Sequence, residues 1–435
     1  MKVYKKMEKD ISILFVGKSL ADIAGLSYVS ASLLKRFGKE GYKIGYINIE
    51  GTLMDKKNIE VQGKDFKDLN IFLYNAPLLN KEKCQDFNFA IEDFKPNIVI
   101  SINDPWLLDQ FLVCPYKENF FWVNYTLFEV PIYPPTVLFP TPIFPTVRKE
   151  IIKVYEEADL NIPVTKMGKK TLENFKLKNI SEDNVYLGID LEDRVITNKT
   201  KNQVFKANIK NDDFVFMCMG VNNERKMMGR LLESFSIFLD NIDNKEKYKL
   251  YLHSDTYKFY GGTDLIQLAA DLKLLNNVVF SQPGKIYDRK ELMERYALCD
   301  CYISIPGGEG FGYGFLEAIL HNKPVIYSSY GGHVEVCAGC GLEVPIIDYV
   351  SATNAHLVLG LADRKATAKM MEMIVKEEKI RKKYSNVGFE KVKENFDWDK
   401  QFVKFKNIVF SNYEIWNSYQ QNKFFNKFNP KGIKI

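Results

Sequence analysis

The sequence is most informative at Gly307-Gly308-Glu309-Gly310-Phe311-Gly312-Tyr313-Gly314-Phe315-Leu316-Glu317-Ala318. The apolar run 301–305 before it predicts a strand, the run 315–321 predicts a helix, and the run 324–327 predicts another strand. Glycines let a backbone approach a ligand closely, and a helix start offers unpaired N–H groups to an anion. Glu309 and Glu317 would repel a phosphate, but they can accept hydrogen bonds from sugar hydroxyls. The pattern therefore predicts a site for a sugar that is attached to a phosphate.

Three simpler interpretations of this stretch fail on residue spacing. A dinucleotide fingerprint, Gly-x-Gly-x-x-Gly, would need its third glycine at Phe315, Tyr313 or Glu317. An NTPase phosphate loop would need Gly-Lys-Ser or Gly-Lys-Thr, which does not close this loop. A retaining glycosidase needs two carboxylates roughly 5 Å apart, whereas Glu309 and Glu317 would lie about 12 Å apart along a helix. These two therefore cannot form that pair with each other, although a carboxylate from elsewhere in the chain could partner either one. The remaining alternative is a flexible glycine loop that only turns the chain.

The same residues resemble a known signature. Glu309-x7-Glu317, with Gly-Glu-Gly-Phe-Gly before and Leu-Glu-Ala-Ile after, is similar to the motif of the large family of retaining glycosyltransferases with the GT-B fold. That family includes bacterial phosphatidylinositol mannosyltransferases and sucrose-phosphate synthases. The resemblance implies an α/β protein with two Rossmann-like domains facing across a cleft. It implies an acceptor-binding domain at 1–205, a nucleotide-sugar-binding domain at 206–400, and a crossover helix at 401–435 that packs on the first domain.

Composition sets limits on the class of protein. The chain has 435 residues, 46% of them hydrophobic, and a formal net charge of +5. This mild positive excess gives no reason to expect nucleic acid as a partner, but it favours anionic substrates or peripheral binding to an anionic membrane. We find no secretory signal and no apolar run of roughly 20 residues, so we expect a cytoplasmic protein. Seven cysteines, an odd number, also favour a reducing compartment.

No metal site or redox motif is predicted. Cys337-Ala338-Gly339-Cys340 lacks the second pair that a zinc site needs, and we interpret it as an ordinary loop. The four histidines all lie in the second half and form no metal-binding pair. His333, in the loop that begins after the predicted strand at 324–327, is interpreted as structural. The resemblance likewise implies an enzyme that requires neither a metal nor another cofactor.

The first half contributes candidates near the ends of predicted strands. Gly25 follows the strand at 11–17 and matches the glycine that approaches the donor phosphates in the family. Asp104 follows the strand at 98–102, at the sheet edge where ligands of open α/β sheets bind, although a turn or helix-capping aspartate is the alternative. Many family members place a histidine after the next strand, at 120–123. This half has none, so Asn124 and Glu129 are the further candidates on the acceptor side.

The second half opens with a strand at 214–219 that ends near two adjacent cations, Arg225 and Lys226. Lys226 matches the family's lysine at the donor diphosphate, whereas Val221 stands at the usual arginine position. The dipole of the following helix disfavours cations at its start, which argues for a function; a solvated charge pair is the alternative. Gly284 matches the glycine whose turn meets the nucleotide base. The polar segment 197–212 is predicted to link the domains.

The resemblance implies a metal-independent hexosyltransferase that moves a sugar from a GDP- or UDP-linked donor to a carbohydrate, lipid or protein-linked glycan. Lys226, Arg225 and the helix start would stabilise the charge that grows on the diphosphate. Glu309 and the backbone of Gly310, Phe311 and Gly312 would hold the donor sugar; Tyr313 joins the donor-binding set, and Glu317 takes the ribose hydroxyls. The alternatives are a sugar-nucleotide epimerase or a phosphorylase on the same scaffold, and an inactive sugar-nucleotide-binding or scaffold protein.

Overall fold

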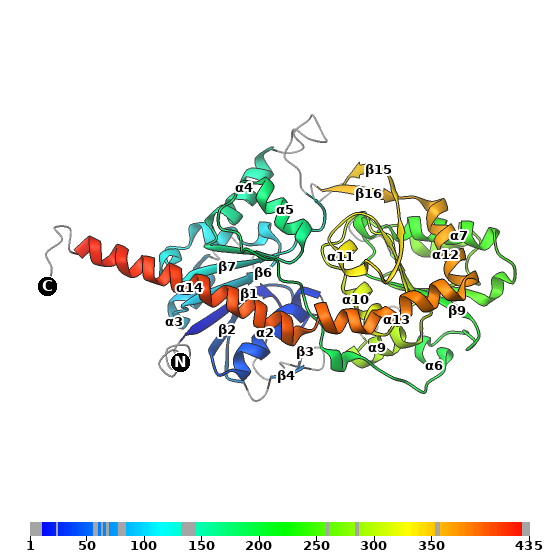
Figure 1. Ribbon diagram of the computed structural model, residues 1–435, viewed down its shortest axis with the longest axis horizontal. Helices are drawn as coiled ribbons and strands as arrows, with labels where there is room; N and C mark the ends of the chain where they lie inside the picture. The colour runs from blue at the N-terminus through cyan, green and yellow to red at the C-terminus, as the bar shows by residue number, and fades with distance from the viewer. Residues whose placement is uncertain are drawn as a thin grey trace.

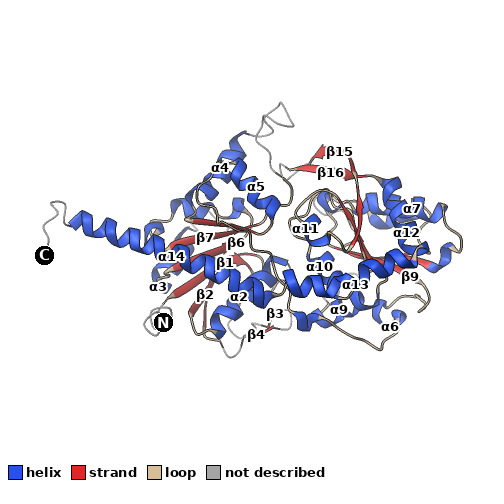
Figure 2. Ribbon diagram, in the orientation of Figure 1, coloured by secondary structure: helices blue, strands red, loops and turns tan. Residues whose placement is uncertain are grey.

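A computed structural model describes residues 11–22, 25–54, 60–61, 64–66, 69–76, 84–131, 145–257, 261–282, 287–352 and 357–428. Two parallel six-stranded sheets dominate it, and Figure 2 shows helices flanking both. Alternate residues of the first strand belong to different apolar clusters, Ile13 and Phe15 to one, Leu14 and Val16 to another. Because side chains of a strand alternate between its faces, this sheet is buried on both sides, as parallel sheets are.

The first sheet has the order β5-β2-β1-β6-β7-β8. Its strands are β1 (Ser12–Lys18), β2 (Lys43–Glu50), β5 (Ile71–Asn75), β6 (Ile98–Ile102), β7 (Phe121–Thr126) and β8 (Leu160–Pro163). The helices of this domain are α2 (Gly25–Lys39), α3 (Cys84–Phe94), α4 (Pro145–Glu157) and α5 (Lys166–Asn174), and β3 (Glu60–Val61) pairs with β4 (Lys64–Asp65) apart from the sheet. The strands and helices expected from the apolar runs of this half are thus present.

The second sheet has the order β11-β10-β9-β12-β13-β14. Its strands are β9 (Phe214–Met219), β10 (Tyr248–His253), β11 (Val278–Phe280), β12 (Cys301–Ser304), β13 (Val325–Ser328) and β14 (Gly341–Val344), and β15 (Ile346–Ser351) and β16 (Val358–Ala362) form a hairpin. The helices are α7 (Met228–Asp240), α8 (Leu265–Asp271), α9 (Arg289–Leu298), α10 (Tyr313–Leu320), α11 (His333–Cys337), α12 (Arg364–Lys376) and α13 (Glu378–Asn395).

In each sheet, the order in which successive strands are added reverses at a central strand. β1 lies between β2 and β6, and β9 lies between β10 and β12. In open α/β sheets of this kind, ligands bind beyond the carboxyl ends of the strands at such a switch point. The turns that follow β1 and β9 therefore occupy the positions where a ligand is expected, and they contain Gly25 and the pair Arg225 and Lys226, respectively.

The last helix returns to the first domain. α14 (Trp398–Phe428) starts near α13 and runs along the first domain, as Figure 1 shows. Its aromatic face packs on that domain: the Phe402 ring lies 4.9 Å from Phe37 of α2, and the Phe405 ring lies 4.9 Å from Tyr125 of β7. This confirms the predicted crossover helix. No helix among the described residues combines the length and the apolar character needed to cross a membrane.

The predicted linker is partly structured. The segment 197–212 contains α6 (Lys201–Phe205), which starts with a capping box made by Thr200 and Gln203. Phe205 is buried against Tyr251 of β10, with a ring distance of 4.8 Å. The segment therefore contains a short helix whose apolar residue packs on the second sheet, and its role as the link between the domains stays a prediction. The exact limits of the domains stay a prediction.

The two chain crossings between the domains lie side by side. Ile189 N donates to Phe396 O at 2.8 Å, and Trp398 N donates to Ile189 O at 3.2 Å. We call residues 188–193 and 396–399 the junction. Because both crossings share these hydrogen bonds, the domains are connected at one place rather than two.

Candidate active site

The turn after β9 is fixed by its backbone. Arg225 and Lys226 lie in η7 (Glu224–Lys226), and the Asn223 side chain accepts a hydrogen bond from Lys226 N at 3.0 Å. Met227 follows with a φ of 53°, a left-handed conformation that is uncommon for a residue with a Cβ. Gly307 N donates to Arg225 O at 2.8 Å, which ties this turn to the glycine-rich loop after β12. Residues in such uncommon backbone conformations cluster at functional sites, and Met227 directly follows the cations Arg225 and Lys226.

Glu309 lies between the two cations. Its Oε2 accepts from Arg225 Nη1 at 2.9 Å and also forms an ion pair with Lys226 Nζ. Burial alone would raise the pKa of Glu309, but Lys226 and Arg225 more than offset this and hold the pKa well below its usual value. The structure therefore brings together the predicted sugar-binding carboxylate and both predicted phosphate-binding cations.

The glycine-rich loop leads into α10 without a side-chain cap. Gly312, its N-cap residue, has a φ of +83°, which favours glycine, and no side chain bonds to the first N–H groups of the helix. A Cβ at Gly308 would lie 2.1 Å from Val130 Cγ1, and one at Gly310 would lie 2.6 Å from Leu127 Cγ. Glycine at these two positions thus lets the loop pack against the first domain.

The first domain supplies carboxylates to the same cluster. Glu129 Oε1 lies 2.7 Å from Arg225 Nη2, although burial raises the pKa of Glu129. Asp104, half-buried, precedes η3 (Pro105–Leu107) and makes no capping hydrogen bond there. Burial and the nearby charges of Glu129 and Glu50 raise the pKa of Asp104 to about 7. The acceptor-side candidates Glu129 and Asp104 therefore lie close to the predicted donor-side residues.

Asn124 has a different environment. Its side chain is buried in the first sheet, where Ser101 Oγ donates to Asn124 Oδ1 at 3.1 Å and Asn124 Nδ2 donates to Asn161 Oδ1 at 3.4 Å. In this arrangement it links three strands and makes no contact with the cluster around Arg225. Asn124 was predicted to lie on the acceptor side, but its amide is already hydrogen-bonded within the sheet.

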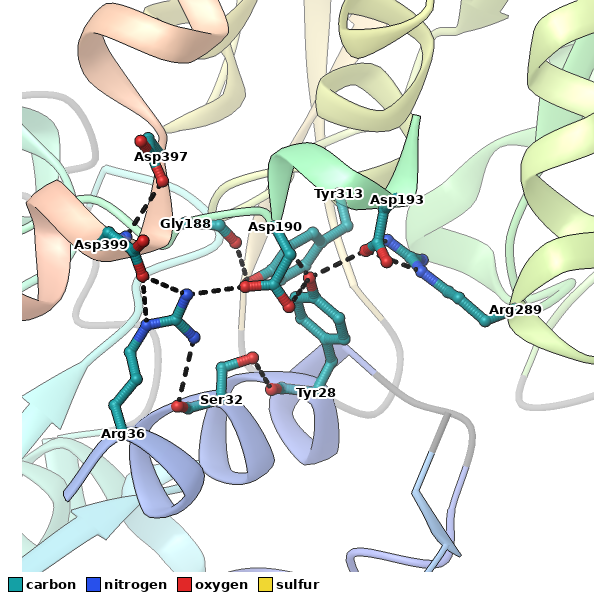
Figure 3. A network of polar contacts seen from close by, with 10 residues as sticks. All are labelled: Tyr28, Ser32, Arg36, Gly188, Asp190, Asp193, Arg289, Tyr313, Asp397 and Asp399. Atoms are coloured by element: carbon teal, nitrogen blue, oxygen red, sulfur yellow. Dashed lines mark hydrogen bonds and ion pairs between the residues drawn. The ribbon is translucent and has the colours of Figure 1, made fainter. Parts of the chain in front are cut away.

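The remaining donor-side candidates lie near the junction or outside the described residues. Gly25 is the first residue of α2, and a Cβ there would lie 3.1 Å from the Tyr313 ring. Tyr313 starts α10, and its hydroxyl donates to Gly188 O at 3.0 Å (Figure 3). Phe311 is buried near Tyr186, at a ring distance of 6.4 Å. Gly284 lies outside the described residues.

Glu317 is buried in α10 and forms an ion pair with Arg289 of α9. Arg289 in turn binds Asp193 at 2.8 Å, and Asp193 accepts from Tyr28 of α2 at 3.0 Å. Sequence analysis missed Arg289, Asp193 and Tyr28. None of them lies in a motif, and only folding brings these distant positions together.

His333 and the Cys-x-x-Cys pair have surroundings that fit structural roles. The His333 ring stacks on Phe315 at 5.1 Å, and His333 N donates to Glu309 O at 3.2 Å, which supports the glycine-rich loop. Burial lowers the pKa of His333 to about 4, so this ring is neutral at pH 7. Cys337 and Cys340 are buried, and burial raises the pKa of both thiols, which disfavours the reactive thiolate.

Known proteins share features of the sequence and the fold of this chain. Residues 199–339 match the family described as glycosyl transferases group 1. No curated protein sequence matches the chain. Three solved structures superpose on nearly all of it. Sucrose-phosphate synthase from Thermosynechococcus elongatus has a TM-score of 0.71 at 16% identity and covers 93% of this chain and 100% of its own. Alr3699/HepE from Anabaena, in complex with UDP and glucose, has a TM-score of 0.69 at 14% identity, covering 92% and 100%.

A third structure, a glycosyltransferase from Rickettsia africae, has a TM-score of 0.64 at 18% identity and covers 95% of this chain and 99% of its own. At such low identity these superpositions establish the fold, and the shared activity is a matter for proposal. The chain thus has the GT-B fold, and its second domain carries a region that matches the glycosyl transferases of group 1.

Proposed function

We propose that this protein is a retaining glycosyltransferase that moves a sugar from a nucleoside diphosphate to the hydroxyl of a carbohydrate, lipid or protein-linked glycan. The observation that carries the proposal is the cluster of Arg225, Lys226 and Glu309 at the switch point of the second sheet, in contact with Glu129 of the first domain. Two cations beside an uncapped helix start suit a diphosphate, and the carboxylates suit sugar hydroxyls.

The transfer uses these groups as follows. The bond between the anomeric carbon and the diphosphate oxygen breaks, and the leaving nucleoside diphosphate takes the electron pair. Arg225, Lys226 and the first N–H groups of α10 stabilise the charge that develops on it. The acceptor hydroxyl attacks the anomeric carbon from the same face, and its proton passes to the departing phosphate. Because the two cations supply the positive charge, the reaction needs no metal ion.

The bound donor changes the pairing of Glu309. Without ligand its carboxylate neutralises Lys226 and Arg225. A diphosphate competes for these cations, and Glu309 is then free to accept hydrogen bonds from the donor sugar. Asp104 and Glu129 lie on the side of the first domain, where an acceptor hydroxyl approaches. UDP is the first nucleotide to test, because the HepE structure contains it.

Release of nucleoside diphosphate tests the proposal. The protein is incubated with UDP- and GDP-linked sugars and a panel of glycan and glycolipid acceptors, with and without a metal chelator. We expect acceptor-dependent release that the chelator leaves unchanged, with an α-linked donor giving an α-linked product by NMR. Lys226→Gln and Arg225→Gln should each lower kcat by about 100-fold or more. Nucleotide binding without any release would instead support a binding protein, and an altered sugar still attached to the nucleotide would support an epimerase.

A further inference from the structure

Arg289 forms ion pairs with carboxylates from two different parts of the molecule. It is the first residue of α9, and its Nη1 pairs with Glu317 of α10. Its Nε and Nη2 both donate to Asp193 Oδ2, at 3.1 and 2.8 Å (Figure 3). The three side chains are 11%, 5% and 18% exposed, respectively, so solvent screens these ion pairs only weakly.

Asp193 anchors this arrangement to the first domain. It ends η6 (Leu191–Asp193) in the junction, and its Oδ2 accepts from the Tyr28 hydroxyl at 3.0 Å. The Tyr28 ring lies 4.8 Å from the Arg289 guanidinium, and its hydroxyl accepts from Asp190 N at 3.1 Å. One guanidinium therefore connects a carboxylate of the second domain with the junction and with α2.

The electrostatics favour a fixed, ionised pair. Burial alone would lower the pKa of Arg289, but the carboxylates of Glu317 and Asp193 raise it well above the usual value. A buried ion pair is costly to break, since removing one partner leaves the other charge without compensation. Arg289 thus holds Glu317 through Oε1, and the buried Tyr296 makes a further side-chain hydrogen bond with the same carboxylate.

Arg36 provides an internal comparison. It also holds two carboxylates of the junction, Asp190 at 2.8 Å and Asp399 at 2.7 Å (Figure 3). Neither partner is predicted to touch a ligand, and Asp190 also accepts from the Tyr28 hydroxyl at 3.3 Å. Arg289 differs in one respect: one of its partners, Glu317, is the predicted acceptor of the ribose hydroxyls.

We propose that Arg289 is a positioning residue for the nucleoside part of the donor. It holds Glu317 in the orientation that accepts the ribose hydroxyls, and it makes this orientation depend on Asp193 and Tyr28 at the junction. Fixing the carboxylate before the ligand arrives removes part of the entropy cost of binding. The inference rests on the proposed function, because it requires a ribose at Glu317.

Binding measurements with two probes separate this role from a general effect on folding. UDP and GDP contain the ribose, whereas inorganic pyrophosphate offers only the group that Arg225 and Lys226 bind. We expect Arg289→Gln to weaken the binding of the nucleoside diphosphate by at least about tenfold, while the affinity for pyrophosphate changes by less than about twofold. Arg289→Lys, which keeps the charge but not the fork geometry, should lie between the wild type and Arg289→Gln.

Variants at the junction test the second half of the proposal. Asp193→Asn weakens one ion pair of Arg289, and Tyr28→Phe removes the hydroxyl that donates to Asp193 but keeps the ring. Both should weaken UDP binding more than pyrophosphate binding, and the double variant Arg289→Gln/Asp193→Asn should lose less than the sum of the single losses. These milder changes also keep the test open if Arg289→Gln does not fold. The surface variant Arg364→Gln, which removes an exposed pair with Glu233, serves as the control and should leave both affinities within about twofold.

Three results would overturn the inference: unchanged UDP affinity in Arg289→Gln, equal losses of UDP and pyrophosphate affinity, or an equal selective loss in Arg364→Gln. A wild-type protein that binds neither UDP nor GDP would overturn the proposed function itself, and the inference with it. The two failures are therefore distinguishable in the same set of titrations.

Discussion

At the scale of single residues, charge balance dominates the site. Arg225 and Lys226 are paired with Glu309, and Arg225 also pairs with Glu129. All four side chains are at most 29% exposed, so these charges interact through a medium of lower dielectric constant than water. A diphosphate that enters must replace carboxylates that the cations already hold. In the proposed reaction, the free energy of donor binding is consequently the difference between the ion pairs that the cations form with the diphosphate and those that they form with Glu309 and Glu129.

Glu309→Gln should separate binding from turnover. The amide cannot neutralise Lys226 and Arg225, so we expect nucleoside diphosphate to bind at least as tightly as in the wild type. The contact that Glu309 makes with the donor sugar is weakened, so kcat should fall by about 100-fold or more. Titration calorimetry and a nucleotide-release assay measure the two effects. Glu378→Gln, at a side chain that is 64% exposed on α13, is the control. Unchanged turnover in Glu309→Gln would contradict the assigned role.

Asp104 should make stability depend on pH. Its native pKa of about 7 lies above the usual value of 3.8, so between these values the native state binds a proton that the unfolded state has released. The free energy of unfolding contributed by this group therefore falls as pH rises through that window. In Asp104→Asn the decrease between pH 5 and pH 8 should be smaller by about 1–3 kcal/mol. Urea denaturation at both pH values measures it, and an equal decrease in both proteins would refute the shift.

Local motifs explain which site residues could be predicted. Glu309 belongs to a long signature, and Arg225 and Lys226 lie in the turn between a strand and a helix, so sequence alone indicated them. Arg289 could not be found in this way, since its partner Asp193 is 96 positions away in the chain. From the sequence, Asn124 and Glu129 were equivalent candidates, and only the structure distinguishes them. The amide of Asn124 is hydrogen-bonded within the sheet, whereas the carboxylate of Glu129 pairs with Arg225.

At the scale of elements, short apolar runs predicted the strands well. The strands expected at 98–102 and 214–219 coincide with β6 and β9, because polar residues or turns bound both ends. Weaker signals were missed. α6 lies in a polar segment where Phe205 is one of few apolar residues, and the hairpin of β15 and β16 exposes Ile347 and Tyr349 to solvent. Such elements depend on neighbours that the local pattern does not contain.

The packing of α14 makes a prediction about this element. Phe405 is fully buried against Tyr125, whereas Val403, two residues earlier, is 52% exposed. We expect Phe405→Ala to lower the free energy of unfolding by about 3–5 kcal/mol, because it leaves a cavity between α14 and β7. Val403→Ala should change it by less than about 0.5 kcal/mol. Chemical denaturation compares the two variants, and similar small effects would mean that α14 does not pack on the sheet as described.

At the scale of the whole molecule, the junction holds the two domains in one arrangement. Arg36 of α2 binds Asp190 in one crossing and Asp399 in the other, at 2.8 and 2.7 Å. Burial alone would lower the pKa of Arg36, but these carboxylates raise it. Glu335 of α11 adds a further contact, since its carboxylate accepts from Met167 N at the start of α5 at 2.8 Å. The relative position of the domains thus depends on a few polar side chains.

Arg36→Gln should therefore weaken the molecule as a whole. We expect a loss of about 1–3 kcal/mol, because Asp190, which is 14% exposed, loses its cation. The pair with Asp399 contributes little, since that side chain is 83% exposed. Lys406→Gln removes the pair with Glu40, which also joins α14 to α2 but lies nearer to solvent, and should cost less than about 1 kcal/mol. Thermal unfolding measures both variants. If Lys406→Gln loses as much free energy of unfolding as Arg36→Gln, the ion pairs of the junction stabilise the protein no more than an ordinary surface pair does.

The return of α14 also determines when the first domain can be finished during synthesis. Phe37, Phe121 and Tyr125 are covered by Phe402, Phe405 and Tyr413, which the ribosome adds only after the entire second sheet. A nascent chain that has not yet reached residue 398 leaves this apolar surface open to water and to other chains. Folding of the leading half is therefore completed last, and until then that surface is a natural target for chaperones.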